Sequence, residues 1–317
     1  MRRAILYLFL LAFSSFGQYA DFVSTGYSAG AAEYLERPVS AQSAALAGAV
    51  VAWRENLAGV QFNPAIVDAT PAGYNVINGT YSLMTLDRKH MGVNSAGTVG
   101  SYLAYGISFI NYGVGNIDGR DSLGNETGAF NYNEDCLALS VAGRIVGNVA
   151  VGGTIRYLNE NYSTGLSGGN GIGFDLGATY EPLPILCVGL SAQNLLSKLW
   201  WNTGHVDPVL MGLRLGVAGL FLEKSLTTEI DVLKTVQQPI QISLGVQYTL
   251  LKIVSARGGI STDTDILKYH SRYPDYSFGI GIRYSVFGFD YACIIPDSDL
   301  GINHKVTLSI GIRDIFR

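Results

Sequence analysis

Residues of the types that carry enzyme chemistry are few in this sequence and are widely spaced. No histidine has a second histidine, a cysteine or a carboxylate at the spacing of a metal site. The four histidines are His90, His205, His270 and His304. His304 follows Asp297 and Asp299, but these residues lie in a predicted turn, and a Ser/His/acid triad is defined by geometry. The sequence therefore does not predict an enzyme.

Three further patterns bear on bound groups, and none of them matches a known site. Cys136, Cys187 and Cys293 are odd in number and far apart, which fits neither a disulfide framework nor a metal finger. The glycine-rich run 165–173 has no helix after it, as a phosphate cradle requires. The oxygen-rich run 118–125 lacks the spacing of a Ca²⁺ loop. We therefore expect no cofactor and no bound metal.

The charge and hydropathy of the chain point to a membrane protein without membrane helices. Charged residues make up 15% of the chain, against about 25% in ordinary soluble domains. The mean hydropathy is positive, yet after residue 17 no apolar run approaches the roughly 18 residues of a spanning helix. Lipid requires every backbone hydrogen bond to be made internally, which leaves a closed barrel. The net charge of −4 and the lack of a basic cluster argue against nucleic acid as a partner.

Strict alternation of apolar and polar residues identifies the strands. Within 240–248 the even-numbered residues are Ile240, Ile242, Leu244, Val246 and Tyr248, whereas the odd-numbered ones are Gln241, Ser243, Gly245 and Gln247. The runs 172–180, 276–284 and 305–313 repeat this pattern over the length of a tilted membrane strand. A soluble β-sandwich is the alternative, but its polar face is usually rich in Lys and Glu.

The polar face here is mostly Gly, Ser, Thr and Gln, which suits a crowded lumen. Six isolated charges on this face are placed to pair inside a barrel: Arg156, Asp175, Arg214, Glu229, Asp231 and Arg283. Counting alternating segments between residues 74 and 313 gives about 14 strands, an even number, as bacterial barrels require. Long connections are predicted at 113–130, 161–170, 195–207 and 262–274. The fold class is thus an all-β, antiparallel, up-and-down transmembrane barrel over residues 74–317.

The N-terminal residues 1–17 have the parts of a signal peptide in the expected order. Arg2 and Arg3 supply positive charge, and residues 4–13 form an apolar run too short to span a bilayer. Small residues precede a cleavage site before Gln18. We therefore expect export to the bacterial outer membrane, with outer-membrane lipid as a partner.

Residues 18–73 do not follow the strand pattern and form a predicted N-terminal plug segment. The stretch 41–53 is small and apolar without alternation. Asn63, Pro64 and Ala65 follow it, and since Asn is a strong helix N-cap and Pro suits the first helical position, a short helical turn should begin there. The segment is too apolar for a free tail and too irregular for the wall, so the lumen is its expected place.

The chain resembles the PorV/PorQ family, outer-membrane barrels of the FadL-like kind, over nearly the whole mature sequence. The small-residue segment 44–65 closing on Asn-Pro-Ala and the run 112–130 are similar to the family's N-terminal segment and first long loop. Further similar stretches are 193–195, 207–208, 213–216, 289–292, 299–301 and His304. The resemblance implies a 14-stranded barrel with an N-terminal plug. Some members serve the type IX secretion system.

Three functions remain open from the sequence. The first is a non-enzymatic role in secreting proteins or attaching them at the cell surface, with secreted proteins or secretion-system subunits as partners, on family analogy. Leu199, Trp200 and Trp201, in a predicted loop, are the candidate partner contacts, because Trp is over-represented at interface hot spots. The alternative is FadL-like transport of hydrophobic small molecules. The third is a purely structural outer-membrane protein.

Overall fold

The computed structural model describes residues 30–54, 57–99, 103–164, 167–264, 274–296 and 301–313. The predicted signal peptide, His270, Asp297 and Asp299 lie outside these residues. No helix in the described ranges is long and apolar enough to cross a membrane.

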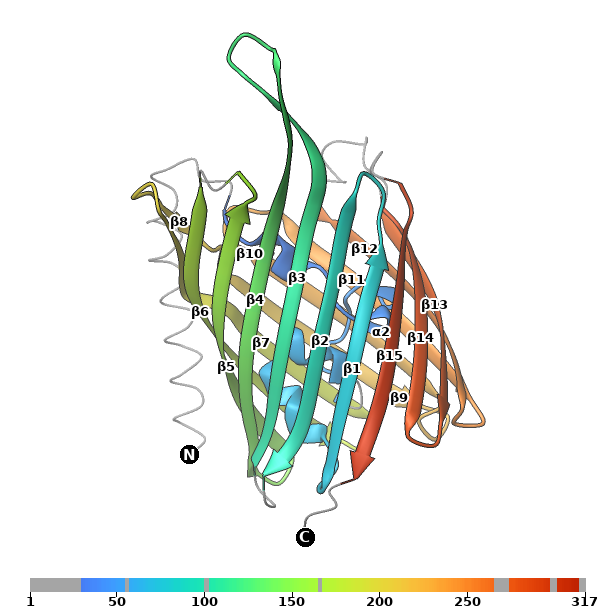
Figure 1. Cartoon of the computed structure of the whole chain (residues 1–317). Coiled ribbons are helices and arrows are strands. Elements are labelled where there is room, and N and C mark those ends of the chain that lie inside the picture. Colours follow the sequence, from blue (N-terminus) through green and yellow to red (C-terminus); the bar gives the residue numbers. More distant parts are fainter. Residues whose placement is uncertain are drawn as a thin grey trace.

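Antiparallel strands form a tall barrel (Figure 1). The strands are β1 (Tyr74–Leu83), β2 (Arg88–Val99), β3 (Leu103–Arg120), β4 (Glu126–Val146), β5 (Val149–Tyr162), β6 (Gly168–Leu183), β7 (Leu186–Trp201), β8 (Val206–Pro208), β9 (Gly212–Phe221), β10 (Leu226–Thr235), β11 (Ile240–Leu250), β12 (Val254–Asp263), β13 (Asp275–Tyr284), β14 (Phe287–Ile295) and β15 (Asn303–Arg313). We call the end that carries the β3–β4 hairpin the upper end (Figure 1).

The wall closes on itself by pairing of its first and last strands. β1 pairs with β15 in continuous register from Tyr74↔Arg313 to Leu83↔His304, and β6 pairs with β7 on the opposite side. The short β8 pairs with β7 alone, so among the described residues fourteen of the fifteen strands make up the wall. The predicted 14-stranded antiparallel barrel is therefore confirmed. Closure leaves none of the fourteen described wall strands unpaired on either side, which is what a lipid environment demands.

The two faces of each strand divide as the alternation predicts. On β11, Ile242 and Leu244 are 38% and 44% exposed, whereas Ser243 between them is 3% exposed. The whole strand alternates in this way from Ile240 to Leu250. The apolar residues thus face outward to lipid and the small polar residues face the lumen, which excludes a sandwich with an apolar interior.

The connection 113–130, predicted as a long loop, is instead mostly strand. β3 and β4 continue to pair beyond the barrel rim and meet at a short turn (Figure 1). The Asp121 side chain accepts bonds from the Leu123 and Asn125 amides at 2.8 and 2.9 Å. A hydrogen bond from the Asn125 side chain lowers the pKa of Asp121. The prediction failed because both faces of this hairpin meet water, so pairing there leaves no hydrophobic period.

Candidate functional site

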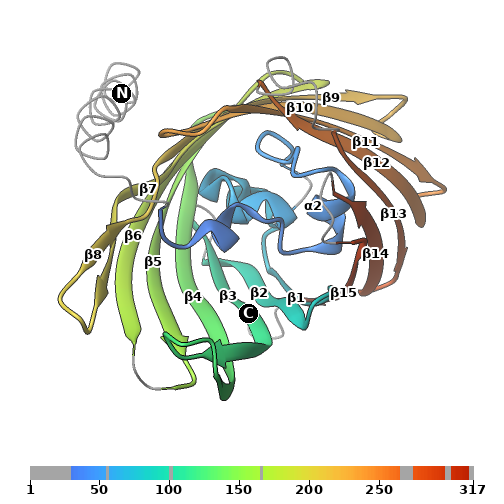
Figure 2. The same cartoon turned by 90° about the horizontal axis from the view of Figure 1, so that it is seen from above.

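Residues 30–54 and 57–73, which we call the inner segment, lie inside the barrel, as the view along its axis shows (Figure 2). The segment contains η1 (Glu33–Glu36), α2 (Ala41–Ala45), η2 (Leu57–Gln61) and η3 (Pro64–Ala69). Many of its apolar side chains are buried almost completely, among them Leu46, Val50, Val51, Phe62 and Ile66. It therefore fills much of the lumen as a packed body.

Glycines on the inner face of the wall make room for the backbone of the inner segment. A Cβ on Gly189 would lie 2.2 Å from the Val51 carbonyl oxygen, and one on Gly259 would lie 2.4 Å from the Leu46 carbonyl carbon. Similar approaches of the inner segment occur at Gly92, Gly152, Gly177, Gly216, Gly245 and Gly279. At Gly189, Gly259 and Gly152 the nearest atoms are backbone atoms of the inner segment, so a side chain there would displace the segment. The inward glycines of the alternating pattern are thus contact points.

Two acidic side chains of β10 bind the irregular backbone of the inner segment. Asp231 Oδ2 accepts hydrogen bonds from the Val50 and Val51 amides at 3.0 and 3.2 Å. Glu229 Oε1 accepts one from the Ala52 amide at 2.6 Å. Residues 50–52 belong to no helix or strand, so their buried amides need acceptors from elsewhere. The two carboxylates provide them.

A second polar group joins β5, β6 and β7. Arg156 Nε donates to Asp175 Oδ2 at 2.6 Å, and another nitrogen of its guanidinium donates to the Gln61 carbonyl of the inner segment at 2.8 Å. Asp175 Oδ1 accepts from the Asn194 amide at 2.9 Å, at a point where the register between β6 and β7 shifts. The predicted pairing of isolated charges inside the lumen is confirmed for Arg156 and Asp175.

The short helix predicted at Asn63–Pro64 is present as η3. The Asn63 side chain caps it by accepting from the Ala65 amide at 3.1 Å. The Asn63 amide group also donates to the Val51 carbonyl at 2.8 Å and to the wall carbonyl of Ala178 at 3.1 Å. Asn63 thus ties two parts of the inner segment to β6. The role of this motif in closing the lumen stays a prediction.

Two cavities of similar size lie on opposite sides of α2. The upper one, of about 370 Å³, reaches Asp275 and Asn303, where β13 and β15 begin. The lower one, of about 360 Å³, reaches Ser285 and Gly311, at the other ends of the same strands.

The contacts of α2 with the wall separate these cavities. The Ala41 amide donates to Thr307 Oγ1 at 2.8 Å, and the hydroxyls of Thr307 and Thr80 are hydrogen-bonded at 2.7 Å. Arg283 donates to Gln42 at 3.1 Å, and Ser277 donates to the Ala45 carbonyl at 3.2 Å. We call α2 with these contacts the partition.

Several groups around the upper cavity were not singled out from the sequence. Lys305, on β15, donates to the Pro38 carbonyl and lies 3.3 Å from His90 Nδ1. Arg37, Glu33 and Glu36 of the inner segment line the same space. Alternation could have placed Lys305 in the lumen, but only the folded inner segment brings it to its partners. Among the described residues no group of His, Cys, Asp and Glu could hold a metal ion.

Leu199, Trp200 and Trp201 lie on β7 rather than in a loop. Asn194 and Leu196 adopt left-handed backbone conformations and interrupt the alternation, which is why the strand was expected to end there. Leu199 is fully buried, so it is not available as a surface anchor. Trp201 donates its indole hydrogen to Asp207 at 2.7 Å, and Trp200 is 48% exposed. That these residues contact a partner stays a prediction. Of the three, Trp200 is the one exposed enough to serve as a surface anchor.

Comparison with known proteins finds likeness only at the level of structure. No family model matches the sequence, and no curated protein matches it. The toluene transporter TbuX of Ralstonia pickettii is similar with a TM-score of 0.62 at 14% identity, covering 88% of this chain and 99% of that one. The toluene transporter TodX of Pseudomonas putida has a TM-score of 0.63 at 11% identity, with 87% and 97% covered.

A Pseudomonas aeruginosa FadL homologue is similar as well, with a TM-score of 0.60 at 10% identity and coverage of 87% and 98%. TbuX and TodX are described as toluene transporters. The comparisons support the broader FadL-like part of the expectation and do not show the PorV/PorQ family. The chain has the fold of the FadL-like outer-membrane β-barrels.

Proposed function

We propose that this protein is an outer-membrane channel for hydrophobic small molecules and that the inner segment acts as its plug. The observation that carries the proposal is the pair of cavities of about 370 and 360 Å³, separated by the partition, inside a FadL-like barrel. Each volume lies within the range of small-molecule sites, about 300–1,000 Å³. A folded polypeptide would not fit either of them.

The chemistry of the upper cavity suits a small molecule with an apolar body. Ala44 and Ala47 from the inner segment, Met84 from the β1–β2 turn and Ile294 from β14 give it apolar surface, and charged side chains of both signs surround that surface. A molecule held there needs only the partition to move in order to reach the lower cavity. The known specificities of TbuX and TodX, which are toluene transporters, support the choice of a monoaromatic hydrocarbon as the first substrate to test.

The test is uptake into vesicles that contain the purified protein. Toluene should enter a trapping reaction inside these vesicles faster than it does in protein-free vesicles, and the rate should saturate with toluene concentration. A sugar of similar size serves as the polar control and should not enter faster. Equal toluene rates with and without the protein would refute the proposed transport.

Handling of exported proteins, of PorV/PorQ type, is the second candidate. The β3–β4 hairpin favours it, because this arm projects beyond the barrel rim (Figure 1). Co-purification from detergent-solubilised outer membranes tests this function. A secretion-system subunit that binds the intact protein, and is lost when the hairpin between residues 115 and 129 is shortened to a tight turn, would favour this function over transport.

A further inference from the structure

Two glutamates face each other on the inner wall near the upper end of the barrel. Glu134 on β4 and Glu160 on β5 are directly paired in the strand register. They are 8% and 3% exposed. Side chains directly opposite each other on antiparallel strands lie about 5 Å apart at Cβ, and like charges in such a pair are destabilising. This arrangement calls for a positive partner.

Arg37 of the inner segment acts electrostatically on Glu134, but no positive side chain among the described residues is a partner of Glu160. Neither carboxylate forms a salt bridge with a described residue. Glu160 Oε2 accepts the Tyr132 hydroxyl hydrogen at 2.6 Å, while Glu160 Oε1 is buried and has no hydrogen-bond partner. Glu33 and Asp207 add further negative charge nearby.

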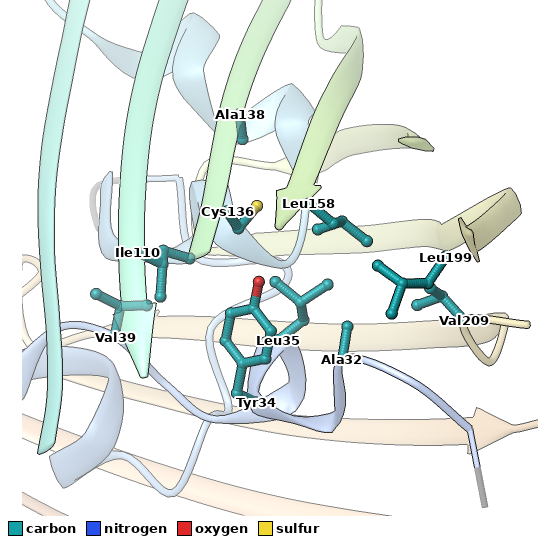
Figure 3. Packing of buried hydrophobic residues seen from close by; sticks show 10 residues of the cluster. All are labelled: Ala32, Tyr34, Leu35, Val39, Ile110, Cys136, Ala138, Leu158, Leu199 and Val209. Atoms are coloured by element: carbon teal, nitrogen blue, oxygen red, sulfur yellow. The ribbon is translucent and has the colours of Figure 1, made fainter. Parts of the chain in front are cut away.

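The hydroxyl of Tyr34, which points toward Cys136 in Figure 3, is a second buried group without a hydrogen-bond partner. Burial raises the pKa of Tyr34, so the phenol stays neutral and adds no further negative charge. An unpaired buried carboxylate is costly in free energy, which a bound cation would relieve.

Aromatic rings surround the two carboxylates. The ring centroids of Tyr132 and Tyr162 are 4.7 Å apart, and those of Tyr162 and Trp201 are 6.5 Å apart. At the same level of the barrel a tyrosine ring already contacts a cation, because the Arg37 guanidinium lies 5.7 Å from the centroid of the Tyr112 ring. Aromatic faces beside carboxylates are the usual recognition elements for amines and quaternary ammonium groups.

The strand register places these groups in one row around the inner wall. Tyr112, Glu134, Glu160, Gly169 and Trp201 follow one another across β3 to β7. The Leu199 and Trp201 side chains pack over Gly169, where an added Cβ would lie 3.1 and 3.3 Å from them. A hydrogen bond to Asp207 fixes the Trp201 indole in position.

The outward-facing row next to these groups shows that they lie above the hydrocarbon layer. Asn111, Asp135, Asn159 and Asn170 are paired across β3 to β6 and replace the apolar residues found lower on the same strands. Asn111 donates to Asp135 at 2.7 Å, and Asn159 donates to Asn170 at 3.1 Å. The glutamate pair therefore lies above the apolar belt of these strands, toward the upper end of the barrel.

We propose that Glu134 and Glu160, with Tyr132, Tyr162 and Trp201, bind an organic cation, an amine or a quaternary ammonium ion with an apolar body. The carboxylates neutralise the charge and the rings contact the alkyl groups around it. This site goes beyond the proposed transport of hydrocarbons, and its binding step is independent of that transport.

The probe for this site is benzyltrimethylammonium, and its uncharged control is neopentylbenzene, which has the same shape. Binding is measured by calorimetry on the full-length protein in an uncharged maltoside detergent, because choline-type detergents carry the probe's own group. A pH of 9 keeps ordinary carboxyl groups ionised. We expect the cation to bind and the neutral isostere to bind at least about tenfold more weakly.

Substitutions separate this site from the rest of the lumen. Glu160→Gln should weaken binding of the cation about tenfold, and the double change Glu134→Gln, Glu160→Gln about a hundredfold. Glu126→Gln, on the exposed hairpin, is the matched control and should leave binding unchanged. Because the double change removes a repulsion, the folded variant should also resist urea at least as well as the parent, which checks that lost binding is not lost folding.

The proposal is overturned if benzyltrimethylammonium does not bind, if neopentylbenzene binds equally well, or if the folded double variant keeps its affinity. Toluene uptake by the double variant is measured alongside. Unchanged uptake with lost cation binding supports the cation site as a separate function. If the parent protein shows no toluene uptake, the proposed transport is refuted and the cation site is not affected.

Discussion

Replacing Gly259 with alanine should push the partition out of place, whereas the same change at its neighbour Gly258 should not. A Cβ on Gly259 would lie 2.4 Å from the Leu46 carbonyl carbon and 2.5 Å from the Ala47 nitrogen, both backbone atoms. Real Cβ contacts essentially never fall below 3.0 Å, so the two sets of backbone atoms must separate by about 0.6 Å. Overpacking of this kind costs about 1–3 kcal/mol.

Gly258 provides the control because it faces the other way on the same strand. An added Cβ there has no atom within 4 Å. Alanine should stabilise the strand at this position by about 0.5–1 kcal/mol, because glycine loses more conformational entropy on folding. The two variants should therefore change the free energy of unfolding in opposite directions.

Urea-dependent folding into lipid vesicles measures both changes in the free energy of unfolding. Ion conductance in planar bilayers measures how completely the inner segment closes the lumen. We expect Gly259→Ala to lower the free energy of unfolding and to raise conductance, and Gly258→Ala to do neither. Equal effects of the two substitutions would show that the inner segment does not rest on this glycine, and the account of the wall glycines as contact points would be wrong.

Three further outcomes follow from the same structure. Ile242→Arg should cost about 2–4 kcal/mol of folding free energy in vesicles, because the side chain faces lipid, while Gln241→Arg faces the upper cavity and should cost much less; equal losses would mean that the faces are assigned wrongly. Asp231→Ala removes the acceptor of two amides and should speed hydrogen exchange at Val50 and Val51 by about 10- to 100-fold, as a loss of about 1.4–3 kcal/mol implies; unchanged exchange would show that this carboxylate does not hold the segment. Deleting residues 18–73 should raise conductance well above the low value expected for the intact protein, since a 14-stranded lumen is too wide for side chains alone to fill; a high conductance that the deletion leaves unchanged would argue against a plug.

The wall could be predicted from the sequence because lipid imposes one rule on every strand. An outward residue must be apolar, so period two appears wherever a strand crosses the bilayer, as on β11. Where that constraint ends, the prediction ends as well. The β3–β4 hairpin rises into water and has no apolar face, and the bulge at Asn194 and Leu196 breaks the period on β7. Both stretches were expected to be loops.

The candidate sites depend on contacts that alternation does not specify. The sequence indicates that Glu134 and Glu160 face the lumen, but only the register of β4 and β5 shows that they are directly opposite. Likewise, Glu229 and Asp231 were recognisable as lumen charges, and their role as acceptors for the amides of residues 50–52 required the path of the inner segment. Residues far apart in sequence meet there through an irregular chain that has no periodic signal.

A reversible lock on the partition tests the central claim most directly. Ala41 and Thr307 are in contact through a 2.8 Å hydrogen bond, so Ala41→Cys with Thr307→Cys, in a protein whose Cys136, Cys187 and Cys293 are replaced by alanine, should form a disulfide that fixes α2 to β15. The account predicts that the oxidised protein takes up toluene no faster than protein-free vesicles do, and that reduction restores the rate. Each single cysteine variant should be insensitive to the oxidant. If the oxidised double variant takes up toluene as fast as its chemically reduced form does, the claim that α2 separates the two halves of the channel is contradicted.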